Sequence, residues 1–292
     1  MVFACFTGFS YFAVKVGLSA AGPLEQMTYR YFFASVGVVL VYLLYGRRKG
    51  WTIKPNGSVI MIAAFYVAFL GIQSWGLVYC TSVVSSILFA CCPILIAVLG
   101  WLVLKEPLRA IQWFGILIGS GAVLYVAYAG QGDVSFSGFG LLLLIISVSC
   151  LTVYSLLLRS ERGKTEPFQI AFYCAVFGEA VLLILMIVKY CLAGDLMGMF
   201  GPANDVKFIM STMYLGICCI VATALLMAFV SVHLPAAQAG VFNNIATVIS
   251  IAAGVLLLGE PIYLYHVICA VFIIGGVVFV NFGTGKARKE GS

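Results

Sequence analysis

Hydrophobic side chains fill long continuous runs along this chain, and short stretches rich in charge, glycine or proline separate them. Crossing the ~30 Å hydrocarbon core of a bilayer takes about 20 apolar residues in a helix, and ten runs approach that length. The predicted helices are 2–20, 27–46, 58–79, 83–104, 108–129, 138–158, 167–192, 207–231, 235–258 and 262–282. The runs do not alternate with a period of two, which excludes membrane β-strands. The pattern predicts an all-α polytopic membrane protein with ten transmembrane helices.

The composition agrees with this prediction. Of the 292 residues, 63% are hydrophobic and 9% are charged, whereas soluble domains carry about a quarter charged residues. The net charge of +6 comes from short Lys and Arg clusters beside apolar runs, so nucleic-acid binding is not indicated. The cysteines lack the spacing of a zinc site or a disulfide framework, and no cofactor or metal is implied.

The positive charges predict an orientation. Ten crossings place both termini on one side of the membrane. The connections on that side and the C-terminal tail hold twelve Lys and Arg residues, and the opposite connections hold only Lys189 and Lys207. By the positive-inside rule, we expect both termini in the cytoplasm and the protein in the plasma (inner) membrane.

The two halves of the chain resemble each other. A shift of 154 residues places Glu106-Pro107 on Glu260-Pro261, and eight of 28 positions are identical between 99–126 and 253–280. We therefore expect two five-helix repeats. Since five is odd, the second repeat enters the membrane from the opposite face, an inverted arrangement typical of secondary transporters. The expected divisions are a first repeat over 1–130, a second over 131–285 and a cytoplasmic tail over 286–292.

Both Glu-Pro pairs have a structural interpretation. Proline is favoured at the first position of a helix, and a carboxylate near a helix N-terminus complements its dipole. Pro107 and Pro261 are thus predicted to start the fifth and tenth helices, with Glu106 and Glu260 near the positive ends.

Scattered motif residues point to a family. They are Lys15, Pro23 in an outer loop, Arg30 followed by an aromatic residue, Gln73, Tyr79-Cys-Thr-Ser82, Pro93 and the two Glu-Pro junctions. With these residues the chain resembles the EamA-like ten-helix members of the drug/metabolite transporter superfamily along nearly its whole length. The resemblance implies a central cavity built from helices one, three, four, six, eight and nine, and the movement of small metabolites, often outward. The chain departs from the family pattern at Thr7-Gly8, where Trp-Gly is usual, and at Thr247, where proline is frequent.

Three ionisable residues fall inside apolar runs: Lys15, Arg30 and Glu179. A charge at the centre of a membrane helix costs at least ~2.5 kcal/mol, so each of these residues needs a partner, a water-filled cavity or a functional role. Lys15 and Arg30 are predicted to lie within ~8 Å of the outer boundary. They form either a funnel for an anionic group on the substrate or a pair of side chains that snorkel to the headgroups, with Glu25 as a counter-ion.

Glu179 lies near the middle of the predicted seventh helix. A carboxyl group there could bind and release a proton as the protein changes conformation, which would couple transport to protons. The alternative is a neutral glutamic acid that is hydrogen-bonded to a neighbouring helix, or one that faces the outside of the bundle.

Uncharged polar and aromatic residues at mid-span are candidates for lining a cavity. They are Tyr11, Gln73, Trp75, Tyr154, Gln238, Asn243 and Asn244. Aromatic walls and a few amides suit a small amphipathic solute. The alternative is that the amides join helices, at ~0.6 kcal/mol each, and that the aromatic residues form interfacial belts.

These patterns together predict a function. No GxxxxGK[ST] motif is present, so ATP hydrolysis by this chain is not indicated, and no catalytic constellation is found. The expected function is secondary transport, with export of small organic metabolites such as amino acids by alternating access. The alternatives are exchange of phosphorylated or anionic solutes on Lys15 and Arg30, and, from a different class, a membrane receptor or an intramembrane enzyme.

Overall fold

The computed structural model describes residues 2–47, 57–104, 108–129, 137–161, 164–223, 226 and 236–287. Side chains are described for these residues except 103–104, 127, 159, 167, 236–244 and 281–287. Within this part of the chain every regular element is a helix, and no strand is present. The all-α class is confirmed.

The helices follow one another along the chain with short connections. Their bounds are α1 Val2–Leu18, α2 Pro23–Val41, η1 Tyr42–Gly46, α4 Gly57–Tyr79, α5 Ser82–Ala90, α6 Cys92–Leu104, α7 Ala110–Ala129, α8 Gly138–Ser160, α9 Pro167–Ala193, η2 Leu196–Asn204, α10 Val206–Gly216, η3 Ile217–Ala222, α12 Ala236–Leu258 and α13 Leu264–Ala287. Each predicted run coincides with one helix or with two consecutive ones.

Several of these helices can cross a bilayer. In the described part of the chain, five helices are long and apolar enough, and the bent pair η2 and α10–η3 makes a sixth if it is taken as one span. Four shorter apolar helices, of 10 to 17 residues, accompany them. These lengths and compositions are those of a polytopic membrane protein.

The predicted helix over 83–104 is interrupted. Its two parts, α5 and α6, meet at Cys91, two residues before Pro93. Proline has no amide hydrogen to donate and clashes with the preceding turn, so the break has a local cause. Hydropathy does not indicate the break, because both parts are strongly hydrophobic.

The predicted start of the last helix at Pro261 is wrong. α12 ends at Leu258, after which Gly259 adopts a left-handed φ of 65° and the Glu260 amide donates to the Gly254 carbonyl at 3.1 Å. The chain then runs without helix to Leu264, where α13 begins. The first Glu-Pro pair, Glu106-Pro107, lies outside the described residues.

Two further boundaries differ from the prediction. α2 begins at Pro23, earlier than expected, so this proline is the first residue of a helix and not part of a loop. The predicted connection over 193–207 contains the 3₁₀ helix η2, which starts where the Asp195 side chain accepts from the Gly198 amide. η2 is bent by 91° from the segment Val206–Ala222 that follows.

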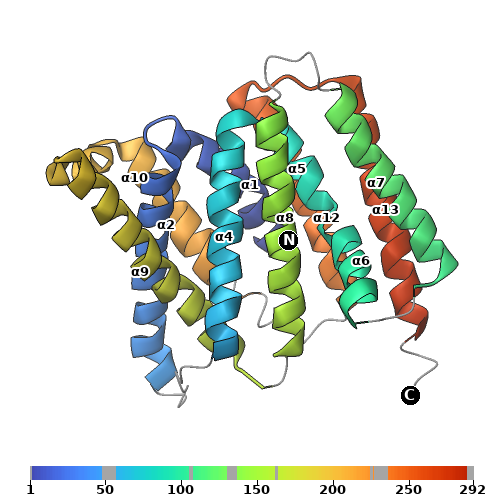
Figure 1. Ribbon diagram of the computed structural model, residues 1–292, viewed down its shortest axis with the longest axis horizontal. Coiled ribbons are helices and arrows are strands. Elements are labelled where there is room, and N and C mark those ends of the chain that lie inside the picture. Colours follow the sequence, from blue (N-terminus) through green and yellow to red (C-terminus); the bar gives the residue numbers. More distant parts are fainter. Residues whose placement is uncertain are drawn as a thin grey trace.

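Helices from the two halves of the chain pack side by side. α7 contacts α13 at one end of the molecule, and α2 contacts α9 and α10 toward the other end (Figure 1). Between them α4 packs on α8, and α1 packs on α12 and α10. The short helix α5 is enclosed by α12, α13 and α8, and all its residues are buried except the partly exposed Phe89.

Candidate functional site

Aromatic side chains form a continuous series through the centre of the bundle. Phe89 packs against Tyr11 and Phe69, with ring centroids 5.8 and 5.5 Å apart. Tyr66 continues the series, at 5.9 Å from Phe69 and 5.0 Å from Tyr154. The series joins α1, α5, α4 and α8, and brings together Tyr11 and Tyr154, two of the residues predicted to line a cavity.

Gln73 joins this centre through a hydrogen bond. Its side chain bonds that of Tyr11, and both residues are buried. Tyr66 lies two helical turns before Gln73 and therefore on the same face of α4. One amide and several tyrosine rings thus converge from three helices, which is a suitable arrangement for orienting an amphipathic solute.

Trp75 does not belong to this site. Its side chain is 51% exposed, and it shares a face of α4 with the exposed residues Met61, Ala64 and Tyr79. Trp75 is therefore outside the buried aromatic series, and its cavity role stays a prediction.

Arg30 is buried and does not snorkel. Only 3% of the residue is exposed, and it lies seven residues after the start of α2, a depth of about 10 Å. Its guanidinium is within electrostatic reach of Tyr66 on α4 and Cys219 in η3. It therefore faces the interior of the bundle, and the snorkelling interpretation is wrong for this residue.

Glu25 is not the counter-ion of Arg30. Its Oε1 atom accepts from the Lys189 ammonium, in an ion pair, and from the Tyr190 hydroxyl at 3.0 Å. Both partners lie at the end of α9. The cluster joins the N-terminus of α2 to the C-terminus of α9.

Glu260 caps a helix from the other half of the chain. Its carboxylate accepts from the Ser82 and Val83 amides at 2.9 and 3.1 Å and from the Ser82 hydroxyl at 2.6 Å. Thr81 accepts from the next amide, that of Val84, at 3.2 Å. The first free amides of α5 are thus satisfied, and the negative charge complements the helix dipole.

Lys15 lies next to this cap. It is half-buried near the end of α1, within electrostatic reach of Glu260. We call Lys15, Glu260 and the first turn of α5 the inter-half clasp. The two cations predicted to form one funnel therefore have different neighbours, since Arg30 faces Tyr66 and Cys219 instead.

Contacts beyond the clasp hold α5 and α12 together. The Ser86 and Ser250 hydroxyls are 2.5 Å apart and buried. A Cβ atom added at Gly254 would lie 2.5 Å from the Ser82 hydroxyl oxygen, so a larger residue at 254 would push the two helices apart.

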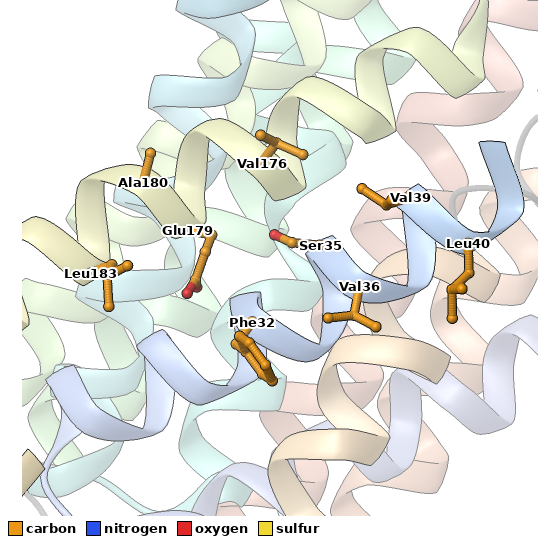
Figure 2. A pocket seen from close by; sticks show the side chains of 9 residues that line it. All are labelled: Phe32, Ser35, Val36, Val39, Leu40, Val176, Glu179, Ala180 and Leu183. Carbon is orange, nitrogen blue, oxygen red and sulfur yellow. The ribbon is translucent and has the colours of Figure 1, made fainter. Parts of the chain in front are cut away.

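Glu179 lines a groove between α2 and α9. The groove has a volume of about 580 Å³ and an apolar lining that includes Phe32, Val36, Val176 and Leu183. Figure 2 shows the Glu179 side chain extending from α9 toward α2. Its Oε2 atom is buried without a hydrogen-bond partner in the described part of the chain. Glu179 is therefore placed apart from the aromatic series.

The remaining predicted residues are on α12. Gln238, Asn243 and Asn244 occupy its first turns, and their side chains lie outside the described residues.

Three residues of this region are not among the site residues predicted from the sequence: Tyr66, Phe89 and Glu260. Tyr66 has a recognisable signal, its two-turn spacing to Gln73 on a single helix face. Phe89 lies two residues before the break at Cys91. The role of Glu260 depends on a contact across 177 and 178 residues, for which the sequence carries no local signal.

Known proteins resemble this chain over its full length. The sequence model of the EamA-like transporter family matches residues 1–128 and 138–282. Similar sequences include the uncharacterized transporter YcxC of Bacillus subtilis (strain 168), at 26% identity over 99% of this chain and 94% of that protein. An uncharacterized transporter of Archaeoglobus fulgidus is 24% identical, with 94% of each chain covered. A solved crystal structure shares the fold with a TM-score of 0.67 and 17% identity, over 100% of this chain and 97% of that one.

Proposed function

Because the chain belongs to the EamA-like transporter family and is a multi-pass membrane transporter, we propose that it moves small amphipathic metabolites, such as amino acids, by alternating access. The direction that we propose is export across the plasma membrane. The observation that carries the proposal is the central group of Tyr11, Gln73, Phe89, Tyr66 and Tyr154, which lies between helices of both halves.

The helix contacts support two inverted five-helix repeats, 1–130 and 131–285. The equivalent helices of the two halves are α1 and α8, α2 and α9, α4 and α10, α5–α6 and α12, and α7 and α13. When each helix is exchanged with its equivalent, the contact of α4 with α8 becomes that of α10 with α1, and the contact of α1 with α12 becomes that of α8 with α6. The exchange also turns α2–α10 into α9–α4 and leaves α7–α13 and α2–α9 unchanged. Every contact in this set is present, as a two-fold relation between the halves requires.

The inter-half clasp supplies a gate in this proposal. Glu260 belongs to the second repeat and α5 to the first, so the site cannot open at that end of the bundle while these hydrogen bonds hold. Lys15 is positioned to stabilise the Glu260 carboxylate electrostatically while this end is closed. By the distribution of Lys and Arg, this end faces the outside of the cell.

Exchange of phosphorylated solutes is the weaker alternative. It needs Lys15 and Arg30 together, whereas Lys15 lies beside an acidic residue and Arg30 beside tyrosines. A receptor or an intramembrane enzyme would not accumulate solute in counterflow, so that measurement separates both from a transporter.

Proton coupling through Glu179 is a separate element of the proposal. Its carboxyl group lies in an apolar groove with one oxygen unpartnered in the described part of the chain, where a permanent charge is costly. A Glu179→Gln variant in proteoliposomes should lose the stimulation of flux by a pH gradient while it keeps exchange without a gradient. Full stimulation in the variant would remove Glu179 from the mechanism.

Counterflow tests the transport function itself. The purified protein is reconstituted in liposomes loaded with a mixture of unlabelled amino acids, and uptake of each labelled amino acid is measured at trace concentration. We expect transient accumulation of at least one of them above equilibrium. A receptor or an enzyme would give no accumulation, and phosphate esters in place of amino acids would test the exchanger.

A further inference from the structure

The burial of Arg30 demands a partner. Its Nε and Nη1 atoms are buried, and neither has a hydrogen-bond partner among the described residues. A buried cation that lacks an acceptor is strongly unfavourable, so such groups are nearly always paired or used in binding. The position of Arg30 in the interior of the bundle, about 10 Å along α2, keeps it from the water that solvates exposed arginines.

The groups around Arg30 include tyrosine hydroxyls, which can donate as well as accept hydrogen bonds. It lies within electrostatic reach of the hydroxyls of Tyr31 and Tyr66, and Tyr154 packs on Tyr66. The Tyr31 hydroxyl is also buried without a partner in the part of the chain that is described. A guanidinium and tyrosine hydroxyls together can donate several hydrogen bonds to one anion.

The carboxylates that could neutralise Arg30 are placed elsewhere in the described residues. Glu25 is paired with Lys189, and Glu260 caps α5. Glu179 faces the groove that Phe32 lines, and Phe32 is about 200° around α2 from Arg30. The positive charge of Arg30 is therefore available to a ligand.

We propose that Arg30, with Tyr31 and Tyr66, binds the carboxylate of the transported solute, so that the substrates are small amphipathic carboxylates. This proposal rests on the transport function proposed above. A carboxylate matches the planar guanidinium in a bidentate pair. The remainder of the solute lies against the rings of Tyr66, Tyr154 and Phe69. One available cation favours a monoanion over a phosphate dianion, because the half-buried cation Lys15 lies beside Glu260.

Matched acids and amides test the proposal with the native protein. Thermal unfolding is followed with the proteinogenic amino acids, with 3-phenylpropionate, and with the corresponding amides. We expect at least one acid to raise the unfolding temperature and its amide to have no effect. Equal shifts for acid and amide, or no shift with any acid, would overturn the proposal. Inorganic phosphate should be without effect, and stabilisation by phosphate alone would overturn it as well.

Variants then assign the effect to Arg30. Arg30→Lys keeps the charge but loses the bidentate geometry, and we expect the dissociation constant of the stabilising acid to rise roughly 10- to 100-fold. Arg30→Gln should abolish the preference for acid over amide. Lys207→Gln is the control, because it removes an exposed cation at the start of α10 and should leave this preference unchanged. If Arg30 only held helices together, its variants would unfold at lower temperature and yet keep the preference.

The outcomes separate this proposal from the transport function. An acid that stabilises the protein but gives no counterflow would refute transport and leave the binding site standing. Counterflow of acid and amide at equal rates would leave transport standing and refute the role of Arg30. Should both Arg30 variants fail to fold, the comparison of acid with amide on the native protein still decides the question.

Discussion

At the scale of single residues, the Glu260 carboxylate makes the most consequential contact between the two halves. It accepts three hydrogen bonds at the start of α5, two of them from backbone amides that have no partner within the helix. A charged acceptor makes such bonds stronger than a neutral one does. The Glu260 side chain is therefore an important contributor to the stability of the closed end of the bundle.

Replacing Glu260 by Gln should destabilise the protein. The Gln side chain keeps one acceptor oxygen but loses the negative charge that complements the dipole of α5. Its amide NH₂ group also faces the donors of Ser82 and Val83. We expect the free energy of unfolding to fall by about 1 to 3 kcal/mol. The measurement is thermal unfolding of the purified protein in detergent. Glu166→Gln is the control, because Glu166 precedes α9, is exposed and makes no side-chain cap. Equal unfolding temperatures for the two variants would contradict the assigned role of the clasp.

The neighbours Gln73 and Trp75 should respond differently to substitution. Gln73→Leu removes the hydrogen bond with Tyr11, and we expect the counterflow rate to fall between about twofold and tenfold, the range for one neutral hydrogen bond. Trp75→Leu alters only an exposed face of α4 and should leave the rate unchanged. Rates are compared after normalisation to the amount of inserted protein. A larger loss with Trp75→Leu would mean that the site lies elsewhere.

Sequence reasoning locates candidate side chains by depth better than by direction. Polar and charged residues inside apolar runs stand out because burying them is costly, and this identifies Tyr11, Gln73 and Arg30. Which way a side chain points depends on the neighbours of its helix. In runs that are apolar all round there is no polar face to indicate this, which is why the sequence leaves two directions open for Arg30 and for Trp75.

At the scale of helices, α7 and α13 approach each other through glycine. A Cβ atom added at Gly115 would lie 2.5 Å from the Gly276 carbonyl oxygen, and one added at Gly276 would lie 2.6 Å from the Gly115 carbonyl oxygen. The contact is between backbones, so no side-chain rotation can relieve it. Small residues at helix contacts of this kind allow close packing in membranes.

Gly115→Ala should separate these helices. We expect a loss of about 1 to 3 kcal/mol in stability, the usual cost of overpacking. Gly121→Ala lies on the same helix, and its Cβ would meet nothing within 4 Å, so that variant should be neutral or slightly more stable. The two variants are compared by thermal unfolding and by the fraction that stays monodisperse in detergent. Equal unfolding temperatures and equal monodisperse fractions for the two variants would contradict the close backbone contact between α7 and α13.

The existence of helices is predictable from the sequence, and their internal breaks are less so. Hydrophobic runs of membrane-crossing length leave few alternatives to helix, because backbone groups must be satisfied within the segment. The break at Cys91 follows from Pro93, which the sequence displays, but η2 depends on local hydrogen bonds of Asp195 that hydropathy does not register. The late start of α13 follows the left-handed residue Gly259, through which the chain leaves α12.

At the scale of the whole molecule, the helix contacts are related by exchange of the two halves, yet the charged residues are not. Arg30 lies seven residues after the start of α2, and the same position on the equivalent helix α9 holds the uncharged residue Cys174. A symmetric scaffold with an asymmetric site can rock between two similar arrangements while it binds a solute in one orientation.

If the repeats are inverted, equivalent connections of the two halves lie on opposite sides of the membrane. Arg47 follows the second helix of the first half, and Lys207 follows the second helix of the second half, and both side chains are exposed. Inverted repeats place these two positions on opposite sides of the membrane, whereas parallel repeats place them on the same side.

Cysteine substitutions decide between these arrangements. In intact cells a membrane-impermeant maleimide should label Lys207→Cys, and it should label Arg47→Cys only after permeabilisation, because the Lys and Arg distribution puts Arg47 in the cytoplasm. Lys164→Cys, in the connection before α9, should behave like Arg47→Cys, and the native chain gives the background from its own thiols. Labelling of Arg47→Cys and Lys207→Cys from the same side would rule out the inverted repeat, and with it the gate formed by Glu260 between two oppositely oriented halves.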